Sequence, residues 1–177
     1  MELFWRRGYA ATALDELVRR TGASRYGLYA TFGGKQDLFL ASLERYSQAV
    51  MDPMLEPLEV ARPSMPAICA CFDRVLDLIR RSGDGRGCLM CNAAFEAAAL
   101  KPAATRRVRR HFERVHGLLA RALTNATRDG LLTRDVAVPA QADHLLGAAA
   151  GSFLLARAGM RLALIRRFVD GAIQGLR

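Results

Sequence analysis

The sequence contains no hydrophobic run long enough to cross a membrane. Its longest apolar run, residues 145–156, stops at Arg157, whereas a membrane-spanning helix needs about 20 consecutive apolar residues. The start of the chain also lacks the order of a secretory signal, because Glu2 precedes the first apolar residues and arginines follow them. These two absences lead us to expect a cytoplasmic protein with no membrane partner.

Sequence motifs of common enzyme active sites are missing as well. There is no Gly-x-Ser-x-Gly sequence, no phosphate-binding loop and no dinucleotide-binding glycine motif. His111 and His116 are five residues apart, which is a poor spacing for two metal ligands on one helix, and no carboxylate motif accompanies them. We therefore expect no catalytic residue, no metal, no cofactor and no enzymatic activity.

Cysteine is scarce, with four residues that form two close pairs. The spacings Cys69-x-Cys71 and Cys88-x-x-Cys91 superficially resemble a series of zinc ligands. Each cysteine also falls on the apolar side of an expected helix, where a free cysteine packs as a small hydrophobic residue. We expect core cysteines; a thiol that senses oxidants or electrophiles and a metal site stay open as alternatives.

The residues that are present favour an all-α fold. No segment alternates apolar and polar residues as a strand does, and there is no internal repeat. A chain of 177 residues with 51% hydrophobic residues can bury a core throughout, as one small and one larger domain. Apolar residues three and four apart predict helices at 12–22, 35–58, 88–100, 102–129, 139–157 and 160–176, another through Ile68 and Ile79, loops at 57–66 and 81–87, and a connector at 131–139.

Residues 12–35 have the pattern of two short helices joined by a tight turn. Thr12 is followed three residues later by Asp15, as in a capping box, and Ser24 is well placed to cap the second helix, with Leu28 facing inward. This arrangement is a helix-turn-helix, whose second helix enters the major groove of DNA. The residues expected to contact DNA are Thr12, Ser24, Arg25, Tyr26, Gly27, Tyr29, Thr31 and Lys35.

The formal net charge of +9 suits a protein that binds a polyanion. The charge is spread unevenly: residues 1–50 hold seven basic and five acidic residues, a net of +2, which leaves +7 for the rest. Much of this excess is arginine on the expected helix 102–129, whose opposite side is apolar. We interpret it as a solvated helix face, with an anionic partner or ligand as the alternative.

Three stretches of the sequence resemble the tetracycline-repressor (TetR) family of bacterial transcriptional regulators. They are residues 3–9, as the end of a first helix, residues 12–22, and residues 24–39. The resemblance implies a three-helix DNA-binding domain over residues 1–46 and a helical effector-binding and dimerisation domain over residues 47–177. Because the first helix of family members usually starts a couple of turns earlier, we expect a misassigned or truncated start that lacks preceding basic residues.

The resemblance also implies a function. The protein is expected to be a homodimeric repressor, associated with the bacterial nucleoid, that binds a palindromic operator in double-stranded DNA and is released by a small apolar or aromatic effector. Two alternatives are a thiol-based sensor of electrophiles or oxidants that uses Cys88 and Cys91, and a sensor domain with impaired DNA binding.

Two further sets of residues follow from position in the family fold. The effector cavity is expected among Phe72, Leu76, Met90, Cys91, Phe95, Phe112 and His116. The last two helices are expected to form a four-helix dimer interface through Leu145, Leu146, Ala149, Phe153, Leu154, Ile165, Phe168 and Val169.

Overall fold

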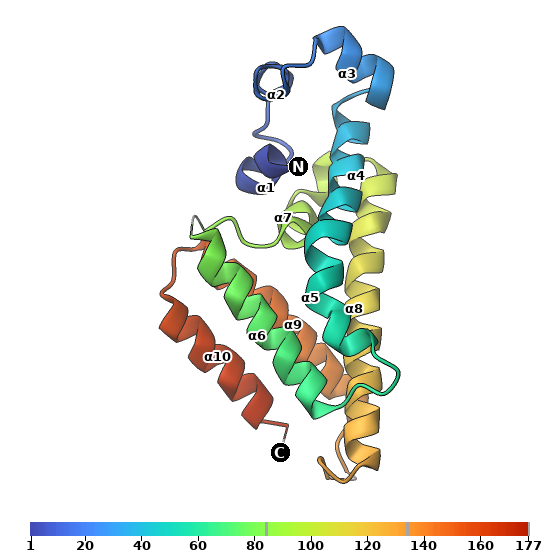
Figure 1. The fold of residues 1–177 in the computed structure, drawn as a ribbon, viewed down its shortest axis with the longest axis vertical. Helices are drawn as coiled ribbons and strands as arrows, with labels where there is room; N and C mark the ends of the chain where they lie inside the picture. Colours follow the sequence, from blue (N-terminus) through green and yellow to red (C-terminus); the bar gives the residue numbers. More distant parts are fainter. Residues whose placement is uncertain (84, 134, 177) are drawn as a thin grey trace.

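The computed structural model describes residues 1–83, 85–133 and 135–176, and every regular element within them is a helix (Figure 1). The predicted all-α class is therefore confirmed. Asp84, in the expected loop 81–87, and Arg134, in the expected connector 131–139, lie outside the described residues, as does Arg177. Across the described ranges, each helix is too short or too polar to span a membrane.

Three short helices form a head at one end of the molecule (Figure 1). They are α1 (Glu2–Arg7), α2 (Leu14–Thr21) and α3 (Arg25–Phe32). Helix α2 ends where Gly22 adopts a left-handed conformation, with φ of 69°, and donates its amide to the carbonyl of Val18. Glycine reaches this conformation without steric cost, so the chain can turn at once into α3.

The head continues into a long helix that changes its winding in the middle. Helix α4 (Lys35–Tyr46) passes into a π-helical turn, η1 (Ser47–Met51), and then into α5 (Asp52–Glu59). Pro53 has no amide hydrogen and its ring crowds the preceding turn, so the wider π turn just before it lets the helix pass. The predicted loop from Pro57 is wrong at its start, because α5 runs on to Glu59.

The remaining helices build the body of the molecule. They are α6 (Met65–Ser82), α7 (Leu89–Phe95), the 3₁₀ turn η2 (Ala97–Ala99), α8 (Pro102–Arg128), α9 (Val138–Arg157) and α10 (Leu162–Gln174). Helix α8 runs alongside α4 and α5, while α6, α9 and α10 pack beside one another (Figure 1). The predicted helix 88–100 is wrong in length, since α7 ends at Phe95 and a 3₁₀ turn follows.

The arginines of α8 bind the long helix rather than forming only a solvated face. Arg107 Nε lies 2.5 Å from the Glu44 carboxylate of α4. Arg114 lies 2.6 Å from the carboxylate of Asp52 and 2.5 Å from that of Glu59, both on α5. Helices α4, α5 and α8 are therefore tied together along one side.

The hydrophobic side chains form two clusters, and one of them joins the head to the body. In this cluster Trp5 of the head packs with Phe39 and Tyr46 of α4, and with Leu89 and Met90 of α7. The Trp5 and Tyr46 rings meet edge-on, with centroids 4.9 Å apart. Because the head shares a core with α7, a shift of α7 has to move the head or expose apolar surface.

Candidate DNA-binding surface and effector cavity

Helix α3 is fixed at its start by Ser24 and on its inner side by Leu28. The hydroxyl of Ser24 accepts a hydrogen bond of 2.9 Å from the amide of Gly27, which confirms the predicted cap. Leu28 is buried, as predicted. These two anchors orient the opposite side of the helix toward solvent.

The exposed side of α3 carries the side chains expected to meet DNA. Tyr26 is 84% exposed, Tyr29 is about half exposed, and Arg25 and Thr31 are also exposed. Arg25 forms an ion pair with the exposed Asp15 of α2. These residues lie at the far end of the molecule, where a duplex has free access (Figure 1).

Lys35 lies at the start of α4 and is held by the turn that precedes α2. Its ammonium nitrogen is 4.3 Å from the centre of the Tyr9 ring and 3.5 Å from the carbonyl oxygen of Ala10. Partial burial lowers the pKa of Lys35, and the Glu96 carboxylate opposes this shift. Lys35 is the first residue of α4, and the N-terminal end of a helix favours an anion.

Thr12 does not join this exposed set. The cap of α2 is Ala13, and Thr12 is fully buried, with its hydroxyl donating a 2.6 Å hydrogen bond to the carbonyl oxygen of Gly8. The predicted capping box is wrong, because α2 begins after Ala13 and not after Thr12. The prediction that Thr12 contacts DNA is also wrong, since its side chain does not reach the surface.

Glu96, which the sequence did not single out, connects the body to the head. Its carboxylate accepts hydrogen bonds from the amides of Tyr9, at 2.6 Å, and Ala10, at 3.1 Å. Gly8 makes room for it: φ there is 83°, and a Cβ would lie 2.8 Å from the carboxylate oxygens. Charge-assisted bonds to backbone amides are among the stronger hydrogen bonds in proteins. The end of α7 therefore holds the turn that contacts Lys35.

The other end of α7 holds α1. The indole nitrogen of Trp5 donates a 2.8 Å hydrogen bond to the carbonyl of Gly87. The amide of Asn92 donates to the carbonyls of Trp5, at 3.3 Å, and Arg86, at 2.9 Å. Arg86 also pairs with Glu2 at 2.5 Å. Both ends of α7 are therefore attached to the head.

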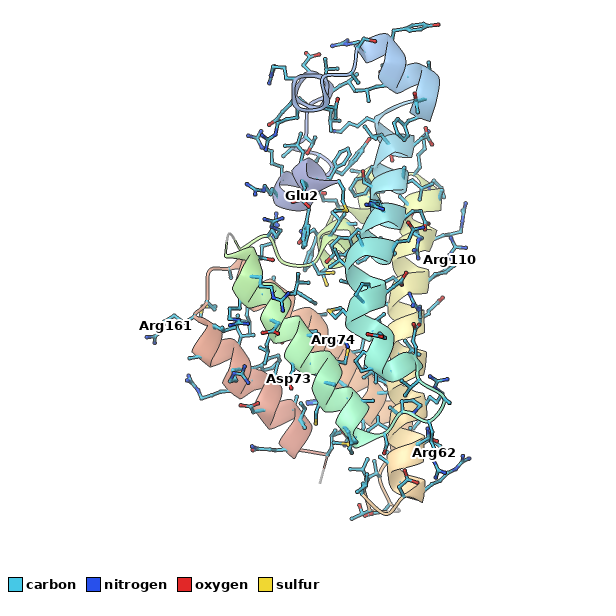
Figure 2. All side chains as sticks on the ribbon, viewed as in Figure 1. Glu2, Arg62, Asp73, Arg74, Arg110 and Arg161 are labelled. Atoms are coloured by element: carbon cyan, nitrogen blue, oxygen red, sulfur yellow. The ribbon has the colours of Figure 1, made fainter. Side chains whose placement is uncertain are left out.

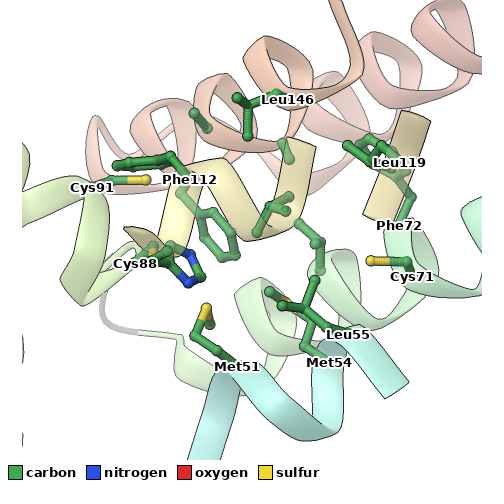
Figure 3. Close-up of a pocket in the computed structure, with 16 residues that line it drawn as sticks. Met51, Met54, Leu55, Cys71, Phe72, Cys88, Cys91, Phe112, Leu119 and Leu146 are labelled. Atoms are coloured by element: carbon green, nitrogen blue, oxygen red, sulfur yellow. The ribbon is translucent and has the colours of Figure 1, made fainter. Parts of the chain in front are cut away.

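A small apolar cavity of about 40 Å³ lies between α5, α6, α7, α8 and α9 (Figure 3). Figure 3 shows Met51, Met54 and Leu55 on one side and Phe112 and Leu146 on the other. The residues that line it are Met51, Met54, Leu55, Cys71, Phe72, Val75, Cys88, Cys91, His111, Phe112, Val115, Leu119, Leu146, Ala149, Ala150 and Phe153.

The predicted lining is correct in part. Phe72, Cys91 and Phe112 line the cavity. Leu76 and Met90 are buried, but in the surrounding core. Phe95 is 73% exposed, because α7 ends there and its last turn faces solvent. His116 lies in a neighbouring surface groove, with Nε2 3.0 Å from the Asp143 carboxylate.

Those four positions are therefore corrected, and the residues missed by the prediction come from every wall of the cavity, with four on α9 and three on α8. Helical spacing identifies apolar helix faces. It carries no signal that distinguishes a cavity wall from a filled core.

Most residues predicted for the dimer interface point into the chain's own body. Leu145, Ile165 and Val169 are buried in the core, and Leu146, Ala149 and Phe153 line the cavity. The exposed members are Leu154, at 50%, and Phe168, at 41%. The four fully buried positions, Leu145, Phe153, Ile165 and Val169, are corrected, because the same chain covers them; Leu146 and Ala149 are partly buried and stay a prediction.

Leu154 and Phe168 belong to an apolar face on α9 and α10 that nothing in the described chain covers. The Phe168 ring packs on Gly151, where a Cβ would lie 3.3 Å from the ring edge. Gly147, one turn before Gly151, is open, with nothing within 4 Å of where a Cβ would be. A flat apolar face with small residues lets another helix approach closely.

The cysteines are all free, and Cys71, Cys88 and Cys91 are buried. Burial opposes ionisation of Cys88, but hydrogen bonds from Cys91 and from the amides of Cys91 and Met90 outweigh it and lower the pKa of Cys88 to about 7. The same contact and burial raise the pKa of Cys91. Burial raises the pKa of Cys71 to about 12. Within the described residues, no three His, Cys, Asp or Glu side chains converge as metal ligands would.

An exposed helix-turn-helix on a helical body that contains an apolar cavity defines a DNA-binding transcriptional regulator. Two family models match the chain: "Bacterial regulatory proteins, tetR family" over residues 1–42 and "Tetracyclin repressor-like, C-terminal domain" over residues 64–171. Because the second match alone covers more than half of the sequence, the chain belongs to the TetR family.

Individual relatives resemble the chain over different lengths. The uncharacterised HTH-type transcriptional regulator YezE of Bacillus subtilis is 28% identical over 146 residues, 82% of this chain and 75% of YezE. The HTH-type transcriptional repressor ComR of Escherichia coli is 54% identical over 46 residues, 26% of this chain and 22% of ComR. A cysteine mutant of the TetR family regulator CifR, complexed with a 26-bp double-strand operator DNA, shares the fold with a TM-score of 0.85 and 21% identity, over 99% of this chain and 92% of that chain.

Proposed function

We propose that this protein is a homodimeric repressor that binds a palindromic operator and is released from it by a small, largely apolar effector. The observation that carries the proposal is the position of the cavity. Its walls include α5, which continues the α4 helix of the head, and α7, which holds α1 and the turn after it through Trp5 and Glu96. A ligand that binds one shape of the cavity better than another would shift α5 and α7, and both of these elements are connected to the head.

The DNA contacts follow from the exposed side of the head. We place α3 in the major groove, with Arg25, Tyr26 and Tyr29 along it, and a phosphate at the first amides of α4 beside Lys35. Similarity to ComR, a repressor by name, and to CifR, solved on its operator, supports this mode of binding.

The domain boundary at residue 46 remains our proposal, and it falls where α4 meets the π turn.

A dimer would explain the uncovered face on α9 and α10. A two-fold operator presents successive major grooves about 34–36 Å apart, and only a protein with two-fold symmetry fixes two recognition helices at that separation. We assign this contact to Leu154, Phe168 and the glycines beside them, in place of the inward-facing residues.

The DNA-binding mode predicts the effect of removing Lys35. Lys35→Ala should weaken binding to specific and unrelated DNA alike, and should lower the slope of log affinity against log salt by about one unit per bound protomer, since each phosphate contact releases counterions. Fluorescence anisotropy on labelled DNA from upstream of the protein's own gene measures both quantities at several salt concentrations.

Arg62→Ala is the matched control for Lys35→Ala. It removes the same charge at the end of the molecule opposite the head (Figure 2) and should leave the slope unchanged. Equal slopes for Lys35→Ala and the unmodified protein would contradict the placement of the phosphate. If the unmodified protein bound upstream DNA no better than unrelated DNA, the alternative of a sensor with impaired DNA binding would be favoured instead.

A second candidate is covalent sensing by Cys88, favoured by its lowered pKa and its place on the cavity wall. The thiolate is the reactive form, so its fraction rises with pH through the pKa. With N-ethylmaleimide, a sulfur–carbon bond would form at the double bond, and water would supply a proton to the neighbouring carbon.

Covalent sensing predicts a labelling rate that rises with a midpoint near pH 7 and operator release on labelling, both lost in Cys88→Ser. Mass spectrometry and anisotropy measure the two effects. The control is Cys69→Ser, which leaves Cys88 in place. A midpoint near that of an ordinary thiol, about 8.5, or release that persists in Cys88→Ser, would exclude this candidate.

A further inference from the structure

The cavity wall has a single polar side chain among its described residues. Fifteen of the sixteen lining residues are aliphatic, aromatic or sulfur-containing, and His111 alone brings nitrogen or oxygen atoms. His111 lies on the inner side of α8, next to Phe112, whose ring centre is 5.5 Å from the centre of the imidazole. An effector in this cavity therefore has one side chain with which it can form a strong hydrogen bond.

The imidazole of His111 has no hydrogen-bond partner in the part of the chain that the structure describes. The residue is 5% exposed, and no hydrogen bond or ion pair joins it to any other residue that the structure describes. A buried polar group without a partner is destabilising, and such groups are rare in folded proteins. A group of this kind on a cavity wall is a site for the polar atom of a ligand.

The arginines near His111 form ion pairs outside the cavity wall. Arg107 pairs with Glu44, and Arg114 pairs with Asp52 and Glu59, all outside the cavity wall. Burial first, and then the positive charges of Arg107 and Arg114, lower the pKa of His111 to about 4, with Asp52 opposing. Near neutral pH the ring is uncharged, so one nitrogen can donate a hydrogen bond and the other can accept one.

We propose that His111 is the polar anchor of the cavity and that the effector is an uncharged, largely apolar molecule with one hydroxyl group, such as a simple phenol. This inference rests on the proposed function, in which the cavity receives the effector. The apolar walls take the hydrocarbon part, and the hydroxyl hydrogen-bonds the imidazole. A carboxylate is excluded from the class, because no described cationic side chain lines the cavity and an unpaired charge is costly to bury.

The proposal is tested by calorimetric titration of the whole protein with 4-ethylphenol and ethylbenzene, which differ only by the hydroxyl group. The unmodified protein should bind the phenol about fivefold to tenfold more tightly, as expected for one buried hydrogen bond. His111→Phe keeps a ring of similar shape but no hydrogen-bonding atom, and it should bring the ratio close to one. His144→Phe, at an exposed position on α9, is the matched control and should keep the ratio.

A second variant covers the case in which His111→Phe fails to fold, as judged by circular dichroism. His111→Gln retains a hydrogen-bonding group and should retain a preference for the phenol. The proposal is overturned if His111→Phe keeps the full preference, if 4-ethylbenzoate binds the unmodified protein more tightly than the phenol, or if neither neutral probe binds.

The failure of the proposed function gives a different result. In that case the phenol would bind with the predicted preference, but operator affinity measured by anisotropy would be the same with and without saturating phenol.

Discussion

Leu154→Arg should convert the protein into a monomer and lower its operator affinity by about 100-fold or more. Leu154 is half exposed in the isolated chain, on the uncovered apolar face of α9 and α10. In a two-fold interface each substitution is present twice, so two unpaired charges would be buried. Leaving one buried charge without a partner costs about 3–5 kcal/mol, and each 1.4 kcal/mol is a factor of about ten. A monomer would then bind half of the operator alone.

Val60→Arg is the matched control for this substitution. Val60 is an exposed aliphatic residue just after α5, away from α9 and α10, so the same change of charge there should leave a dimer. Sedimentation velocity gives the oligomeric state, and anisotropy gives the operator affinity. A Leu154→Arg protein that sediments as a dimer would place the interface on another face.

Local features of the fold were predictable from the sequence because they depend on neighbouring residues. The cap at Ser24, the turn at Gly22 and the extent of α9 need only short-range patterns. Thr12 shows where this reasoning fails. Its spacing to Asp15 fits a capping box, but α2 begins one residue later, after Ala13, and the Thr12 hydroxyl is buried against the carbonyl of Gly8.

The candidate site was predictable only in outline. Helical spacing identified Phe72 and Phe112 as inward-facing, but the same spacing holds for a filled core, a cavity wall and a dimer interface. Phe153, predicted for the interface, lines the cavity for this reason. Glu96 could not be predicted, because its carboxylate binds the backbone amides of Tyr9 and Ala10, which are far from it in the sequence. Almost every residue has a backbone amide, so no pattern of side chains indicates this contact.

A larger side chain on the cavity wall should have the same effect as a bound effector. Ala150 lies on the cavity wall, and Ala150→Phe would place a ring in the space that we assign to the ligand. If the operator-bound head requires the empty shape of the cavity, operator affinity should fall by about 5–150-fold, the usual range for coupling between two sites. Overpacking also costs about 1–3 kcal/mol of stability, so circular dichroism and sedimentation must first establish that the variant is a folded dimer.

The most direct test of the account is the operator affinity of Ala150→Phe, measured by anisotropy beside Ala61→Phe, which adds the same ring at an exposed loop position. Loss of 4-ethylphenol binding in Ala150→Phe would verify that the cavity is filled. We predict that Ala150→Phe binds the operator at least fivefold more weakly than the unmodified protein, while Ala61→Phe binds as tightly. A folded, dimeric Ala150→Phe with a filled cavity and unchanged operator affinity would contradict the account.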